Sequence, residues 1–432
     1  MVDEINRQSA KKFIDSNYSP TFCIKPFTEI CNTARGGMKV CCQSHTNILE
    51  HEDLADTTYV SELFNNDKFK QIRTAMQKGE RVEACRNCYE WEDSGGHSMR
   101  IEYSDRLIKQ DKQIVDEIFT TGIPIVKSLD LKMGNKCNLA CVMCDPSSSS
   151  LIGKERQQNP PTEELDMGIG SSKQIQVDFS QDEFEEIKNV AGNIINVKST
   201  GGEPMLLPGF KDLLEYLVEN GFSKNIKFTT VTNGTVDFSS YLHLMNQFKD
   251  FNILWSIDGV GDTYNFVRYP GNWNSVSRKH QRVMKSLRDN NYENVYMGAS
   301  IAISVYNIHQ MPDILSYVHE DLKINGVADY NIVREPEFMS PALAPKLIID
   351  KSLKLFKEKT NKLLNQGIDL GDKDNIDELI MSKVIELDSN LEKKNKLIRR
   401  LHLVNTYWKD VRNKDAYDYI PFLKDIKNEN TA

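Results

Sequence analysis

The sequence lacks several features that would place it in a specialised class of protein. No apolar run approaches the roughly 18 residues that a membrane-spanning helix needs. The first residues contain no basic stretch followed by an apolar one, so neither secretion nor an organelle is indicated, and we expect a cytoplasmic location. The net charge of −8 argues against a general nucleic-acid surface. We therefore expect a soluble protein with no membrane partner and no nucleic-acid partner.

Cysteine is absent from the last two thirds of the chain, because all nine cysteines lie between Cys23 and Cys144. In a chain without a secretion signal, such clustering favours ligands of a metal centre over a disulfide framework. The length of 432 residues exceeds the size at which a single core usually stops growing, so we expect two or three domains.

The most informative stretch covers residues 133–146 and reads Met-Gly-Asn-Lys-Cys-Asn-Leu-Ala-Cys-Val-Met-Cys-Asp-Pro. It places Cys137, Cys141 and Cys144 at a C-x3-C-x2-C spacing directly after a strand-like run. Three thiolates can hold three irons of a cubane iron–sulfur cluster and leave the fourth iron open to a substrate or cofactor, whereas electron-transfer clusters normally take four cysteines. The alternative is a zinc site or three buried thiols, although zinc prefers four ligands in paired knuckles.

A second group of cysteines lies nearer the start of the chain. One of its motifs is a C-x2-C turn, which follows a polar helix-like segment that ends near Gly79. The other is a glycine followed five positions later by a cysteine, and two overlapping residue pairs fit this spacing. The residues of this group are Cys23, then Gly36 with Cys41 or Gly37 with Cys42, and then Cys85 and Cys88. We prefer Cys41, from the Gly36 register, and leave Cys31 without a role. Four such thiols would satisfy either a closed iron–sulfur cluster or a structural zinc ribbon.

The central third of the chain alternates strand-like and helix-like segments, which predicts βα units and a parallel sheet. Six strands are expected, at residues 126–133, 194–200, 226–232, 252–258, 295–303 and 329–334. A capping box at residues 180–183 begins one helix, and residues 147–178 are expected to form a long loop over the mouth of the barrel. Past Arg334 the pattern is helical and highly charged, which is typical of solvated helix faces.

Polar and glycine-containing motifs follow several of these predicted strands. Gly201, Gly202 and Glu203 come after the second strand, where glycine lets the backbone approach a ligand and a carboxylate can accept hydrogen bonds from an ammonium group. Residues 232–234 read Thr-Asn-Gly, which is equally consistent with a plain turn. Ser256 and Asp258 are two residues apart, so both side chains can point into a barrel.

At the three-cysteine loop the sequence resembles the radical S-adenosylmethionine (radical SAM) enzymes, which carry the same loop after the first strand of a partial α/β barrel. The resemblance implies a 4Fe–4S cluster whose open iron chelates SAM. It also implies that Gly201, Gly202 and Glu203 hold the methionine amino group of SAM. Further implied SAM contacts are Met143 to adenine, Ser256 and Asp258 near the ribose and carboxylate, and Arg268 to the carboxylate.

The first group of cysteines resembles the twitch auxiliary-cluster module of radical SAM and SPASM proteins, here placed before the barrel. The string that follows, C-x2-C-x3-E-x2-G-x2-S-x-R, is also similar to that group, and it ends at Arg100. An ordinary solvated turn and helix start is an equal alternative for this string. The resemblance implies a second 4Fe–4S cluster with four cysteine ligands.

These patterns together predict an α/β fold built as a partial (β/α)6 TIM-like barrel of the radical SAM type. We expect an N-terminal auxiliary iron–sulfur domain at residues 1–120, the barrel at 121–340 and a helical extension at 341–432. The resemblance implies a peptide or small-molecule substrate and an electron donor such as flavodoxin or ferredoxin. The reaction subtype and the oligomeric state are left open. The alternatives are a cluster-bearing regulatory or binding protein without turnover, and a zinc-ribbon N-terminal half on an enzyme with a single cluster.

Overall fold

A computed structural model describes residues 2–33, 37–44, 46–49, 64–162, 165, 181–326, 328–368, 370 and 376–426. The chain divides into two compact units, each built from several segments. Unit 1 contains Met1–Gly134, Val177–Thr200 and Lys211–Phe228, and unit 2 contains Asn135–Gln176, Gly201–Phe210 and Thr229–Ala432. Among the described residues, no helix is both long enough and apolar enough to cross a membrane.

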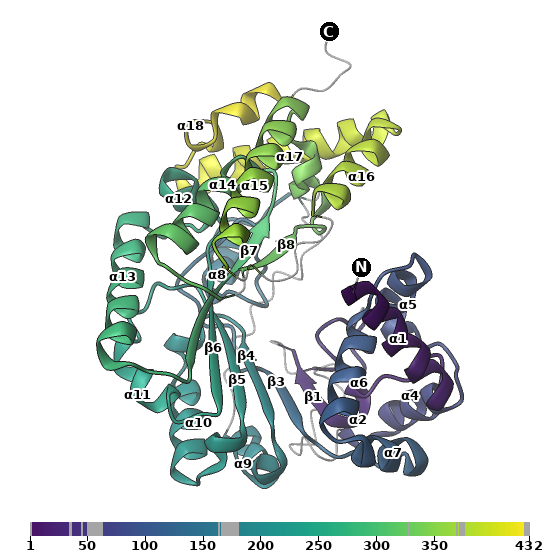
Figure 1. Ribbon diagram of the computed structural model, residues 1–432. Coiled ribbons are helices and arrows are strands. Elements are labelled where there is room, and N and C mark those ends of the chain that lie inside the picture. Colours follow the sequence, from purple (N-terminus) through teal and green to yellow (C-terminus); the bar gives the residue numbers. More distant parts are fainter. Residues whose placement is uncertain are drawn as a thin grey trace. The chain divides into compact units, whose positions relative to one another are not determined.

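The helices in the first segment of unit 1, before β3, surround an apolar core and are drawn in purple and blue in Figure 1. They are α1 (Val2–Asn17), α2 (Lys25–Thr28), α4 (Asp67–Gln77), α5 (Arg86–Asp93), α6 (Met99–Gln110) and α7 (Lys112–Thr121). The core gathers Ile14 from α1, Phe22 and Phe27 from the segment around α2, and Ile101 and Ile118 from α6 and α7. Local signals fix the boundaries, because the Ser98 side chain caps α6 by accepting from the backbone N–H of Ile101.

Unit 1 also holds four strands in the order β2, β1, β3, β4. They are β1 (Glu29–Asn32), β2 (Met38–Lys39), β3 (Ser128–Lys132) and β4 (Asn196–Thr200). Strands β1 and β2 pair in the antiparallel direction, with Cys31 opposite Lys39, and Gly36 between them lies outside the described residues. The sequence did not predict that β1 also pairs in parallel with β3, with Cys31 opposite Asp130.

Unit 2 contains three adjacent parallel strands, β6 (Asp250–Ser256), β7 (Val295–Ile303) and β8 (Ala328–Ile332) (Figure 1). Strand β5 (Lys227–Thr232) begins in unit 1 and ends in unit 2. Along β6 every second side chain is buried, which places Phe251, Ile253 and Trp255 on the covered face. The six predicted strands therefore correspond to β3 to β8, and the α/β fold class is confirmed.

The remaining helices connect the strands or form the carboxyl-terminal region. The connecting helices are α8 (Ser150–Gln158), α9 (Gln181–Val190), α10 (Pro208–Glu219), α11 (Leu242–Met245), α12 (Gly261–Val267), α13 (Trp273–Asn290) and α14 (Met311–Ser316). The prediction of a loop throughout residues 147–178 was wrong at its start, because Ser149 caps α8 by accepting from Ile152. Most of the remainder of that stretch lies outside the described residues.

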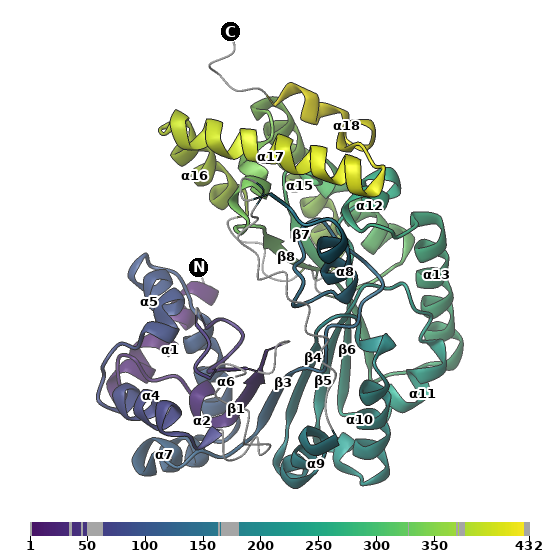
Figure 2. The ribbon, with the colours of Figure 1, turned by 180° about the vertical axis from the view of Figure 1, so that it is seen from behind.

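The carboxyl-terminal helices are α15 (Lys346–Asn365), α16 (Ile376–Asp388), α17 (Leu391–Arg412) and α18 (Ala416–Tyr419), and Figure 2 shows α17 beside α16 and α18. The tail is attached to the segment that follows the three-cysteine loop. Arg412 makes a two-point ion pair with Glu155 on α8, with N–O distances of 2.8 and 2.7 Å. The Tyr407 hydroxyl donates to the carbonyl of Asn159 at 2.7 Å. The predicted helical tail is confirmed. One side of it packs against the rest of unit 2, so its helices are not exposed to solvent on all faces.

Candidate functional site

The loop after β3 carries the three cysteines of unit 2 and is fixed at several points. The backbone N–H of Ser150 donates to the carbonyl of Asn135 at 2.7 Å, and the Ser149 hydroxyl donates to the carbonyl of Leu139 at 2.6 Å. The N–H of Val142 donates to the carbonyl of Val267 at 2.9 Å. These bonds hold the loop against both the start of α8 and the end of α12.

The three cysteines of this loop remain partly exposed, and the charges of Cys137 and Cys141 both act on the Cys144 thiol. Desolvation raises the pKa of Cys141 to about 11, and the neighbouring Cys137 contributes in the same direction. The backbone N–H of Leu139 and the side-chain amide of Asn233 both donate toward the sulfur of Cys137, at 3.4 and 3.8 Å. Donors to sulfur favour the thiolate that iron binding requires. The residues therefore fit a cluster held by three thiolates.

Gly202 lies directly against the cysteine loop. A Cβ at this position would overlap the carbonyl oxygen of Lys136 and would lie 2.7 Å from the carbonyl carbon of Asn135. The N–H of Glu203 donates to that same Lys136 oxygen at 2.9 Å. Only glycine permits this approach, so the Gly-Gly-Glu turn is built against the residue that precedes Cys137.

Substituting Gly202 should separate the two segments. Gly202→Ala should destabilise the protein by about 1–3 kcal/mol, because the added methyl group must displace backbone rather than a flexible side chain. It should also lower the iron bound after anaerobic reconstitution. Thermal unfolding and iron analysis measure both effects, with Gly192→Ala as the control, since a Cβ there meets only Phe222 at 3.8 Å. Equal behaviour of the two variants would contradict the close approach.

Glu203 is fully buried, and its carboxylate joins two strand ends. Oε1 accepts from the Thr232 hydroxyl at 2.6 Å and from the Met205 N–H at 3.2 Å, and Oε2 accepts from the Asn233 N–H at 2.7 Å. Burial raises the pKa of Glu203, and these hydrogen bonds act in the opposite direction. Because a carboxylate offers about four acceptor positions, one remains for an ammonium group.

The turn at residues 232–234 is more than a plain turn. The Asn233 side chain donates to Asn138 at 3.0 Å as well as toward Cys137, and the Thr235 hydroxyl donates to the Asn233 oxygen at 2.6 Å. Sequence reasoning missed both Asn138 and Thr235. Their signal was position alone, since Asn138 follows the first cysteine of the loop and Thr235 follows the turn.

Asp258 and Arg268 form a buried ion pair. The Arg268 Nε and Nη2 atoms lie 2.8 and 2.6 Å from Asp258 Oδ2, and Asp258 Oδ1 accepts from the Ala302 N–H at 2.7 Å. Burial opposes the charge of Arg268, yet Asp258 and the nearby Cys141 raise its pKa. The predicted SAM contacts of Ser256, Asp258, Arg268 and Met143 stay predictions. The geometry adds that Asp258 holds Arg268 in place.

A second set of thiols lies within unit 1. Cys23, Cys41, Cys85 and Cys88 line one small cavity, together with Lys25, Ala84, Arg100 and Tyr103. Cys42 does not line this cavity, and among the charges that act on its thiol are those of Lys198 and Asp130. Cys31 is buried on β1 opposite Asp130. The structure thus directs Cys41 to the other three thiols, whereas Cys42 and Cys31 lie elsewhere.

Polar groups are directed at the thiols of this cavity. The backbone N–H of Arg100 is directed at the Cys88 thiol and lowers its pKa against a larger effect of burial. The Tyr89 hydroxyl is buried beside Cys85 and has no hydrogen-bond partner of good geometry within the described structure. No three His, Cys, Asp or Glu side chains of the described residues converge on the position of a single metal ion. Four thiols with donors around one space fit a cluster.

Comparison with protein families matches residues 131–318 to the Radical SAM superfamily. The matched segment runs from the last part of β3 past α14, so it includes the three-cysteine loop, the Gly-Gly-Glu turn and the ion pair between Asp258 and Arg268. A search of curated proteins gave no match.

Similar solved structures include SuiB from Streptococcus suis bound to the precursor peptide SuiA, with 12% identity and a TM-score of 0.37 over 66% of this chain and 61% of that chain. They also include histidine-tagged anSMEcpe with bound AdoMet, with 20% identity and a TM-score of 0.39 over 57% of this chain and 61% of that chain. A third is the radical S-adenosylmethionine methyltransferase TsrM from Kitasatospora setae, with cobalamin and a [4Fe-4S] cluster bound. It shares 10% identity and a TM-score of 0.32 over 48% of this chain and 34% of that chain. This chain therefore spans less than two thirds of the length of each.

Proposed function

We propose, from the match of residues 131–318 to the Radical SAM superfamily, that this protein is an enzyme that binds SAM at a 4Fe–4S cluster held by Cys137, Cys141 and Cys144. The observation that carries the proposal is the packing of the three-thiol loop against Gly202 and Glu203. When bound, such a cluster supplies one electron to the sulfonium of SAM, which yields methionine and a 5′-deoxyadenosyl radical that abstracts hydrogen from a substrate.

In this proposal, residues of the protein hold the cluster and orient SAM on it. The three thiolates leave one iron without a protein ligand. Glu203 offers its remaining acceptor position to the ammonium group of SAM, and its other hydrogen bonds fix the direction of the carboxylate. Asp258 binds Nε and Nη2 of Arg268 through one carboxylate oxygen, so Nη1 is the guanidinium nitrogen that Asp258 leaves for the SAM carboxylate.

We further infer a second cluster, held by Cys23, Cys41, Cys85 and Cys88 in unit 1. Support comes from the shared cavity and from the hydrogen-bond donors around it. Four cysteine ligands leave no open iron, so the role of this cluster is electronic or structural. The proposed substrate is a peptide or a small molecule, and the electron donor is a flavodoxin or ferredoxin. The alternatives are a zinc ribbon in place of the second cluster, and a regulatory protein that binds SAM without turnover.

The proposal is tested by anaerobic reconstitution with iron and sulfide, followed by reduction with dithionite in the presence of SAM. The protein should convert SAM to 5′-deoxyadenosine and methionine, which liquid chromatography with mass spectrometry detects. A reconstituted protein that binds SAM but forms no deoxyadenosine would favour the regulatory alternative. Mass spectrometry of candidate peptides and small molecules incubated with the active protein would then identify the substrate class.

Removing the Glu203 carboxylate should weaken SAM binding. The ammonium group would lose a charged acceptor, which is worth roughly 1.5 to 3 kcal/mol. Glu203→Ala should therefore raise the Kd for SAM roughly tenfold to a hundredfold. Titration of the reconstituted protein measures the change, with the exposed Glu219→Ala as the control. An unchanged Kd in a folded, cluster-loaded Glu203→Ala protein would show that Glu203 only braces the two turns.

A further inference from the structure

Arg100 is a buried cation within the four-thiol cavity of unit 1. Its side chain is only 1% exposed, and it lines the same cavity as Cys23, Cys85 and Cys88. It is the second residue of α6, whose first N–H groups are free of helical partners. One of these, the N–H of Arg100 itself, is directed at the Cys88 thiol. Both the guanidinium and the start of the helix therefore present positive charge toward the sulfurs.

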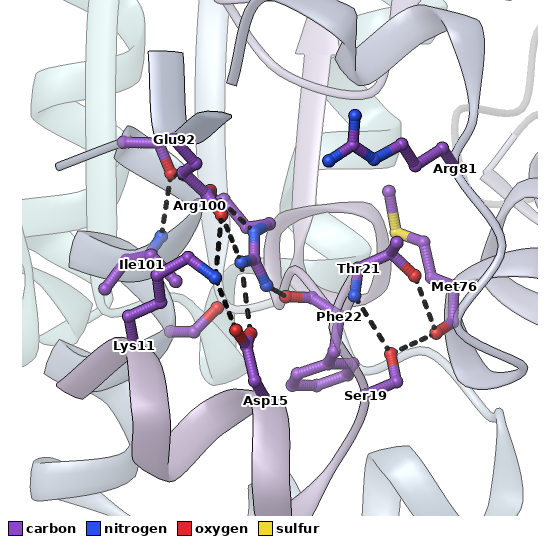
Figure 3. Close-up of polar contacts among 12 residues, drawn as sticks. Lys11, Asp15, Ser19, Thr21, Phe22, Met76, Arg81, Glu92, Arg100 and Ile101 are labelled. Atoms are coloured by element: carbon purple, nitrogen blue, oxygen red, sulfur yellow. Dashed lines mark hydrogen bonds and ion pairs between the residues drawn. The ribbon is translucent and has the colours of Figure 1, made fainter. Parts of the chain in front are cut away.

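A network of carboxylates fixes the guanidinium, as Figure 3 shows. Nε and Nη2 of Arg100 lie 2.8 and 2.5 Å from the two oxygens of Glu92, and Nη2 lies 3.2 Å from Asp15. Ser98, the residue that caps α6, also donates to Glu92. Lys11 pairs with Asp15 and lies 3.6 Å from Glu92. Two carboxylates and two cations thus form a network without net charge.

This network explains the spacing of the string that follows the C-x2-C turn. Glu92 lies in the last turn of α5, one helical turn beyond Cys88, and Ser98 and Arg100 begin the next helix. The string is therefore not a solvated turn, because Glu92 and Arg100 are both buried and bonded to each other. Nη1 of Arg100 donates to the carbonyl of Phe22 at 2.9 Å, and Phe22 precedes Cys23. One side chain thus joins the segments that carry Cys23 and Cys88.

The two charges of the pair act differently on the thiols. Arg100 acts on Cys23, Cys85 and Cys88, and it lowers the pKa of each against a larger effect of burial. Glu92 acts appreciably only on Cys88. Arg100 lines the cavity and Glu92 does not, so the guanidinium is the charge of this pair that faces the thiols. At Cys88, where both charges act, the effect of Glu92 is the larger of the two.

We propose that Arg100 is the positioning residue that sets the reduction potential of the second cluster, by holding a fixed positive charge and a backbone donor against its cysteine ligands. The inference rests on the proposed four-thiolate cluster. Reduction adds one negative charge to the cluster, and a buried cation stabilises that charge, so Arg100 raises the potential. Glu92 opposes this effect and keeps the guanidinium oriented.

The test uses the full chain with Cys137, Cys141 and Cys144 replaced by alanine, so that only the second cluster can form. Into this background are placed Arg100→Gln, Glu92→Gln and the two together. Redox titration followed by electron paramagnetic resonance measures the midpoint potential of each. We expect the order Glu92→Gln highest, then the background protein, then the double variant, and Arg100→Gln lowest. Arg106→Gln is the matched control, because Arg106 lies on the same helix but is exposed and pairs with Glu102.

Two different results distinguish failure of the Arg100 role from failure of the second cluster itself. A background protein that binds zinc without sulfide would refute the second cluster itself, and with it this inference. A background protein with about four irons and an Arg100→Gln potential equal to that of Arg106→Gln would overturn the inference alone. If Arg100→Gln loses its cluster, the upward shift in Glu92→Gln is still required. A merely structural Arg100 would change cluster content without producing the predicted order.

Discussion

The variant with Cys137, Cys141 and Cys144 all replaced by alanine should form no 5′-deoxyadenosine from SAM. The three thiols lie on one loop, whose backbone is held by hydrogen bonds with Glu203, Ser150 and Val267. With no thiolates the cluster that chelates SAM cannot assemble, and the loss should be complete rather than partial. Chromatography of the reaction after anaerobic reconstitution and dithionite reduction gives the measurement.

Cys31→Ala is the matched control for this experiment. Cys31 is a free cysteine, buried on β1 in unit 1, and it belongs to neither proposed set of ligands. Its replacement should leave deoxyadenosine formation at the parent level. If the triple variant instead cleaves SAM as fast as the Cys31→Ala protein, the assignment of the cysteine loop is wrong and the proposed function fails with it.

The sequence predicted the strands well because their signal is local. Several of the predicted strands are followed by a polar or glycine-containing motif, and the strand expected at 295–303 matches β7 (Val295–Ile303) at both ends. The motifs at the strand ends were found for the same reason, since Cys137 and Gly202 follow β3 and β4 directly. Chemistry that depends on contiguous residues is therefore visible in the sequence.

Features that depend on pairing between distant segments could not be predicted in this way. The parallel pairing of β1 with β3 joins residues about a hundred positions apart, and nothing in the four residues of β1 specifies that partner. The choice between Cys41 and Cys42 depends on which way two adjacent side chains point, which spacing does not determine. The partners of Glu203 were equally hidden, because Thr232 and Asn233 come from the next strand.

Replacing Cys85 and Cys88 by alanine should remove the second cluster and leave the SAM-binding cluster intact, which is the reverse of the triple variant. Both residues belong to the cavity in unit 1, whereas the cysteine loop belongs to unit 2, as do the Ser150 and Val267 backbones that hold it. The reconstituted double variant should lose about four of roughly eight irons and the same share of sulfide. It should still form deoxyadenosine from SAM, because the thiols that hold the SAM-binding cluster are intact.

Product formation should respond differently from SAM cleavage in this double variant. If the second cluster accepts an electron from the substrate or holds the substrate in place, conversion of substrate should fall while cleavage of SAM without substrate continues. Iron, sulfide and zinc analysis of the purified protein decides between a cluster and a zinc ribbon. A parent protein that carries one zinc ion and only four irons, with the zinc lost in the double variant, would replace the second cluster by a zinc ribbon. The two-cluster mechanism would then be abandoned, and the SAM-binding half would stand alone.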